Sequence, residues 1–155
     1  MLVAFFGVIA MALILMFQPY VEPPGAQDWH DPEVVDDMAQ HFIIYKNIVV
    51  NHLSDNPSTP NGTILDSSVN APAGWGFPNF HHKARKSSNG WAYVWSEVPG
   101  AFYNKVYEHA DYSVSVCRVI DTRQCVRADS ATATLPASLV PSYITTGSTV
   151  YAWRH

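Results

Sequence analysis

No lysine or arginine precedes Lys46 in this sequence. A cleaved secretory signal needs a basic start and small residues at the cleavage site, and Pro24-Gly25-Ala26 is a poor match to the second requirement. Cysteine is also missing from the N-terminal region, since the two cysteines are Cys117 and Cys125, and this excludes a lipoprotein. We therefore predict that the N-terminal segment is retained.

Charged and hydrogen-bonding side chains are absent from residues 1–17. Leu2 to Phe17 would form a helix of about 24 Å, slightly shorter than the hydrocarbon core of a bilayer. Extending the helix to Tyr20 closes most of that gap, and Pro23-Pro24-Gly25 cannot continue it. The pattern predicts a transmembrane anchor at 1–20, a linker at 21–30 and one domain at 31–155.

Motifs for catalysis and cofactor binding are missing as well. The sequence has no phosphate-binding glycine loop, nucleophile elbow, zinc motif or dinucleotide fingerprint. Its net charge of -4 argues against nucleic acid as the main partner. We predict a protein that is not an enzyme and binds no cofactor, metal or small-molecule substrate. The open alternative is a module that binds or cleaves the cell wall through Trp75, Phe77, Trp91 and the carboxylate of Glu97.

Acidic residues cluster beside the predicted anchor. Every charged residue from Glu22 to Asp37 is acidic. Such a flank is unlike the basic segments that are held at an anionic cytoplasmic surface. We expect the anchor to cross the bacterial inner membrane once, with the domain in the periplasm.

The two cysteines lie in a segment, 112–128, whose valines and isoleucine favour a β-hairpin. If the hairpin centres on Asp121, Cys117 and Cys125 face each other across the strands, close enough to bond. We predict that the two cysteines are bonded and clamp a β-hairpin at the edge of the sheet, where closing so small a loop stabilises the fold by roughly 2.5 kcal/mol. The alternatives are two free thiols in a reducing cytosol, or a pair of metal ligands.

The clearest soluble element is a long amphipathic helix. Asp31 can cap its N-terminus, Pro32 suits its first turn, and the pattern continues to Ser54. At 100° per residue, one apolar face is expected to pack on the domain. The exceptions are a lysine within the apolar stripe and two isoleucines on the polar side, which predict contact with a partner protein or, alternatively, a snorkelling lysine and tolerated surface isoleucines. These residues are Lys46, Ile44 and Ile48.

Strands are expected in the second half of the chain. Trp91 to Ser96 alternates large and small residues, which predicts a central strand covered on both faces. A short helix is expected at 99–109, and a strand at 149–153 completes the sheet. The basic cluster 81–86 is predicted to be a solvated loop. The fold class is therefore α+β, with a long helix packed on a small antiparallel sheet.

Several short motifs, taken together, resemble one protein family. They are Ala39-Gln40-His41-Phe42-Ile43-Ile44-Tyr45-Lys46-Asn47, Asn56-Pro57, Gly62-Thr63-Ile64, Trp75, Tyr93-Val94-Trp95, Pro99-Gly100 and Leu135-Pro136. In these the chain is similar to the small PilM proteins of type IVb pilus operons, which occur with the thin pili of conjugative plasmids. The likeness extends along the whole chain.

The resemblance implies a membrane-anchored, pilin-like accessory protein of pilus biogenesis. Its partners would be other pilus assembly proteins or pilin subunits, at the inner membrane. The alternative is a minor pilin, built into the fibre or placed at its tip. A type IV prepilin has a basic leader and a glutamate at the fifth mature position, and the segment around Gly7 has neither.

Overall fold

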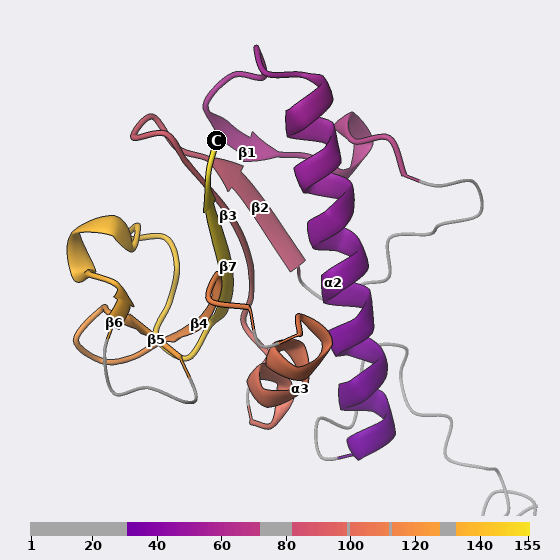
Figure 1. Cartoon of the computed structure of the whole chain (residues 1–155), viewed down its shortest axis with the longest axis vertical. Helices are drawn as coiled ribbons and strands as arrows, with labels where there is room; N and C mark the ends of the chain where they lie inside the picture. Colours follow the sequence, from indigo (N-terminus) through magenta and orange to yellow (C-terminus); the bar gives the residue numbers. More distant parts are fainter. Residues whose placement is uncertain (1–30, 72–81, 99, 112, 128–132) are drawn as a thin grey trace, which may run out of the picture.

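The computed structural model describes residues 31–71, 82–98, 100–111, 113–127 and 133–155. Within these ranges the chain forms two α-helices and one seven-stranded antiparallel sheet, so the predicted α+β class is confirmed. Figure 1 shows the long helix α2 (Pro32–Asp55) standing along one face of the sheet, with the short helix α3 (Phe102–His109) beside its N-terminal half.

Sheet order differs from chain order at one strand. The last strand along the chain, β7, lies in the middle of the sheet between β3 and β4, so the strand predicted to complete the sheet joins its two halves instead. The order is β1-β2-β3-β7-β4-β5-β6. The bounds are β1 (Gly62–Ile64), β2 (His82–Lys86), β3 (Trp91–Ser96), β4 (Val116–Val119), β5 (Cys125–Val126), β6 (Ala133–Leu135) and β7 (Thr149–Arg154).

Local sequence signals determine where α2 begins and ends. The side chain of Asp31 accepts a hydrogen bond from the backbone N–H of Glu33 at 2.9 Å, as expected of an N-cap. At the other end the Asn56 N–H bonds to the His52 carbonyl at 2.9 Å. The helix is one residue longer than predicted. Helix α3 begins at Phe102 and ends at His109, so its predicted C-terminus is confirmed and its start lies further along the chain.

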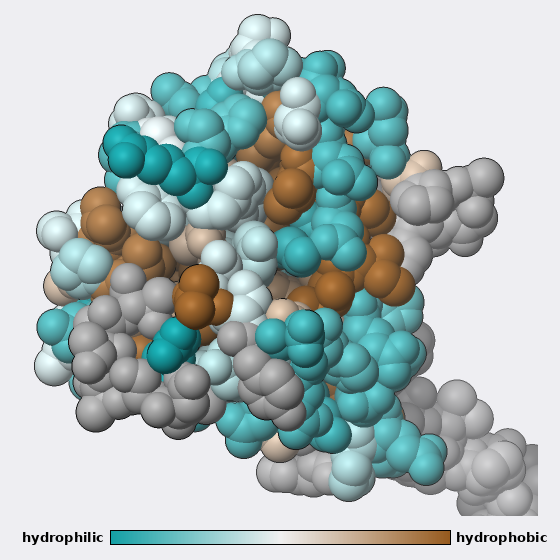
Figure 2. All heavy atoms as spheres, in the orientation of Figure 1, coloured by the Kyte–Doolittle hydropathy of each residue, from teal (hydrophilic) through white to brown (hydrophobic). Residues whose placement is uncertain are grey.

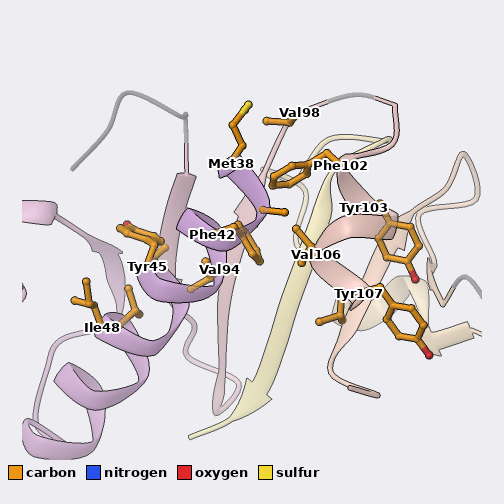
Figure 3. Packing of buried hydrophobic residues seen from close by; sticks show 14 of the residues in the cluster. Met38, Phe42, Tyr45, Ile48, Val94, Val98, Phe102, Tyr103, Val106 and Tyr107 are labelled. Carbon is orange, nitrogen blue, oxygen red and sulfur yellow. The ribbon is translucent and has the colours of Figure 1, made fainter. Parts of the chain in front are cut away.

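The first hydrophobic core lies between the two helices and the sheet (Figure 3). Phe42 of α2 is fully buried and meets Phe102 of α3 edge to face, with ring centroids 5.8 Å apart. Val94 of β3 belongs to the same cluster. The apolar stripe predicted for α2 supplies most of the helix side of this core, including Val35, Met38, Ala39, Val49 and Leu53.

A second core lies on the opposite face of the sheet. Tyr93 of β3 is fully buried there and donates its hydroxyl hydrogen to the Leu139 carbonyl at 2.8 Å. Residues 136–147, which include the short helix η2 (Ala137–Leu139), contribute Val140 and Ile144 to the same core. The central strand is therefore covered on both faces, as the alternation in the sequence predicted.

The basic cluster is a strand, and its prediction as a loop was wrong. In β2, Ala84 is 1% exposed and lies in the first core, while Arg85 lies on the other face with its guanidinium 4.5 Å from the ring centroid of Tyr143. Ala84 is the only apolar residue of β2, and its neighbours are basic. No alternation of apolar and polar residues therefore marks this segment of the sequence as a strand.

Neither helix in the described part of the chain is long and apolar enough to span a membrane. The predicted anchor at 1–20 and linker at 21–30 lie outside the described residues and stay predictions.

Candidate interaction surface

The three residues predicted to contact a partner have different surroundings. Ile44 is 38% exposed, on the outer side of α2. Ile48 is only 6% exposed, so its predicted place on the surface was wrong. The chain after α2 returns along this side of the helix, where the Tyr45 hydroxyl donates to Asp66 Oδ1 at 3.1 Å and Ile64 of β1 joins the same core. Ile48 is therefore a core residue.

Lys46 contacts its own domain. Its Nζ lies 4.7 Å from the ring centroid of Tyr151 in β7, which is a cation–π distance. Burial of the side chain lowers the pKa of Lys46. The lysine stem therefore covers apolar surface while its charge sits over an aromatic face, in agreement with the snorkelling interpretation.

The predicted disulfide between Cys117 and Cys125 is present, with the two Cα atoms 5.3 Å apart and both residues fully buried. The predicted register was wrong, because Cys125 lies opposite Val119 and the bond runs diagonally between the strands. The turn is centred on Thr122, one residue further along the chain than Asp121. Arg123 has φ of 60° and its N–H bonds to the Ile120 carbonyl, which is the geometry of a three-residue hairpin loop.

The bond also lies further from the sheet edge than expected. Strand β5 pairs with β6, so β6 is the edge strand and the disulfide lies one strand inside it.

The residues proposed for a cell-wall site are not brought together. Glu97 is an exposed residue paired with Lys83 at 2.9 Å, and it follows the last residue of β3. Trp91 begins β3, so the two positions are roughly 20 Å apart at the rise of a β-strand. Trp75 and Phe77 lie outside the described residues. Among described residues, no group of three or more His, Cys, Asp or Glu could hold a metal ion.

Where β3 begins at Trp91 and β7 ends at Arg154, the surface forms a hollow of about 310 Å³, which we call the end groove. Most of the described lining is apolar, and among these residues only Arg154 is charged. It is lined by Trp91, Val114, Ser115, Leu135, Ala152, Trp153 and Arg154. Val114, which precedes β4, is 62% exposed although it is a large apolar residue.

These lining residues come from four separate parts of the chain, so no contiguous motif marked them. Only Trp91 was singled out from the sequence, and the role considered for it there was a different one. Figure 2 shows hydrophobic surface along α2 and a second hydrophobic area on the side where β6 and η2 lie.

The N-terminal end of α2 is acidic, in contrast to the end groove with its Arg154. Asp36 accepts hydrogen bonds from Gln40 at 2.9 Å and from His109 at 3.0 Å, and the bond from Gln40, followed by that from His109, lowers the pKa of the Asp36 carboxyl. Lys105 of α3 lies 3.7 Å from the same carboxylate. These contacts tie α2 to α3, and they leave Asp37 and Glu33 exposed beside a second hollow of about 390 Å³.

Comparison with known proteins gives a family and a fold. The sequence profile of the PilM family matches residues 10–152. The crystal structure of a protein described as PilM from Escherichia coli B7A superposes with a TM-score of 0.59 at 16% sequence identity. The match covers 80% of this chain and 96% of that one, and at this identity it concerns the fold alone. No curated protein matches the chain.

Proposed function

Because the chain belongs to the PilM family, we propose that it is a non-enzymatic accessory protein of type IVb pilus biogenesis. The family match over residues 10–152 is the observation that carries the proposal. A pilus-associated role follows from the family, whereas the accessory role, the absence of catalysis and the anchoring are our proposals. In this role the domain works by binding other pilus proteins.

We place the protein in the inner membrane, with one transmembrane segment and the domain in the periplasm. The support is the uncharged run at 1–17 together with the acidic residues that follow it. The buried Cys117–Cys125 disulfide is also typical of a domain that folds in an oxidising compartment.

Protease accessibility in spheroplasts tests this placement. Protease added to intact spheroplasts should digest the domain, and a cytoplasmic marker protein in the same sample should stay intact. Survival of the domain until the membrane is permeabilised would contradict a periplasmic location. In the same strain, deletion of the gene should reduce the number of assembled pili, with the reduction reversed by the gene supplied in trans.

The second candidate, a minor pilin, is favoured by the long helix packed on an antiparallel sheet, which is the arrangement expected for pilin-like proteins. Mass spectrometry of sheared, purified pili separates the two roles. An accessory protein should stay in the membrane fraction, whereas a minor pilin should appear in the pili in stoichiometric or tip amounts.

A further inference from the structure

We propose that the end groove is a docking site for an extended segment of a partner protein, in which a bulky apolar side chain stands next to acidic residues. The partner's apolar side chain would enter the hollow of about 310 Å³. Its carboxylate would lie beside Arg154, on the wall of the groove.

The apolar part of the proposal rests on exposed large side chains. Val114 is 62% exposed at the groove, and Trp91, which packs at the margin of the second core, is only partly buried. The side chain of Trp153 packs against the first core, on the other face of the sheet. Tryptophan is enriched among the residues that dominate binding energy at protein interfaces, because its large surface can be fully desolvated by a partner. An apolar side chain seated against Trp91 and Val114 would remove this surface from water.

The charge of the groove indicates which kind of apolar partner fits. Arg154 is exposed and makes no ion pair with any acidic residue in the described part of the chain. Among the described residues that line the groove there is no acidic one, although the protein as a whole has a net charge of -4. A complementary segment therefore supplies a carboxylate, which steers the encounter and fixes the register of binding.

The same reasoning weighs against two other occupants. Residues 1–17 of the chain are apolar but carry no carboxylate to complement Arg154. A second copy could offer Leu65, which is 61% exposed beside Asp66, but the Asp66 carboxylate accepts a hydrogen bond from Tyr45 in its own domain. Its other such pair, Ile120 and Asp121, lies in the turn between β4 and β5 and is not an extended segment. A segment of a different protein that contains both an acidic and a bulky apolar residue complements Arg154 and the apolar lining of the groove.

That this partner is a pilus protein rests on the proposed function. The binding chemistry is measured on the purified chain, so the two can fail separately. If peptides bind as expected and pilus assembly is unaffected by the loss of this protein, the groove stands and the pilus role falls.

The test uses the full chain in detergent micelles and three short capped peptides labelled with fluorescein. The first places leucine and phenylalanine between aspartates, the second replaces the aspartates with lysines, and the third replaces the two apolar residues with alanines. Fluorescence anisotropy measures the dissociation constants. The first peptide should bind about fivefold or more tightly than either control at low salt, with the difference reduced by added salt.

Two variants and one control localise the binding. Arg154→Glu should reverse the preference between the acidic and the basic peptide. Val114→Asp should weaken binding of the acidic peptide by at least about fivefold. Because Val114 is 62% exposed, the change leaves the core intact. Arg118→Glu, an exposed arginine of β4 outside the groove, should leave both preferences unchanged.

Three outcomes would overturn the proposal. In the first, the three peptides bind equally or not at all. In the second, the Arg118→Glu variant reverses the preference as strongly as Arg154→Glu. In the third, the chain forms a dimer that Val114→Asp dissociates, which would show that a second copy occupies the groove.

Discussion

Loss of the Cys117–Cys125 bond should destabilise the domain by a small and calculable amount. The two cysteines are eight positions apart, so the bond closes a short loop. In the chain-entropy model this constraint on the unfolded chain contributes about 2.5 kcal/mol. That energy corresponds to roughly 70-fold in the folding equilibrium constant. The folded domain should survive, because the first core, between the helices and the sheet, contains neither cysteine.

Urea denaturation with and without a reducing agent measures the effect. The midpoint should fall by about 1–2 M when the bond is reduced, with the slope of the transition unchanged. A Cys117→Ala and Cys125→Ala double variant should lose more than the reduced protein, by roughly 1 kcal/mol for each buried sulfur removed from the second core.

Two results would refute this reasoning. A loss below about 1 kcal/mol would mean that the loop is already closed in the unfolded chain, so that the bond removes little entropy. Complete unfolding on reduction would mean that the first core cannot hold the sheet without the second. Alkylation of native protein before any reduction controls for incomplete oxidation, since a bonded pair takes up no reagent.

The remaining predictions concern the two faces of α2. Ile44→Asp should change the free energy of unfolding by no more than about 0.5 kcal/mol, because Ile44 is partly exposed. Ile48→Asp should lower the free energy of unfolding by several kcal/mol, because it buries a carboxylate. Thermal denaturation of the two single variants measures both effects. Hydrogen bonds from Gln40 and His109 lower the pKa of the Asp36 carboxyl in the folded protein. The stability that these bonds give is therefore fully present above pH 3.8, the ordinary pKa, and is lost as the pH falls through the lower pKa of the folded state. The stability difference between the protein and an Asp36→Asn variant should therefore be constant at neutral pH and shrink only below 3.8, and a difference that persists in strong acid would contradict an ionic cause.

The features that could be predicted from the sequence are those coded locally. Helix α2 was found because its cap, its first-turn proline and its apolar stripe all lie within one segment. The disulfide was found because two cysteines flank a turn. In both cases the signal and the structure occupy the same short stretch of chain.

The features that could not be predicted depend on contacts between distant segments. Ile48 looked exposed by helical periodicity, and only the return of the chain along α2 buries it. The hairpin register depended on Arg123, a non-glycine residue in the left-handed region, which gives no sequence signal of its own. The end groove joins Trp91, Val114 and Arg154 only because β7 lies between β3 and β4.

The central position of β7 also sets the order in which the domain can be completed. Before Thr149–Arg154 is available, β1, β2 and β3 can pair with one another, and β4, β5 and β6 can do the same, but no other strand in the described part of the chain joins the two groups. Both hydrophobic cores draw residues from β3 and its neighbours across this join. A chain emerging from a ribosome or a translocation channel therefore stays open along the middle of its sheet until Thr149–Arg154 is released. During that interval the half-sheets expose the unpaired edges of β3 and β4 to chaperones and to neighbouring chains.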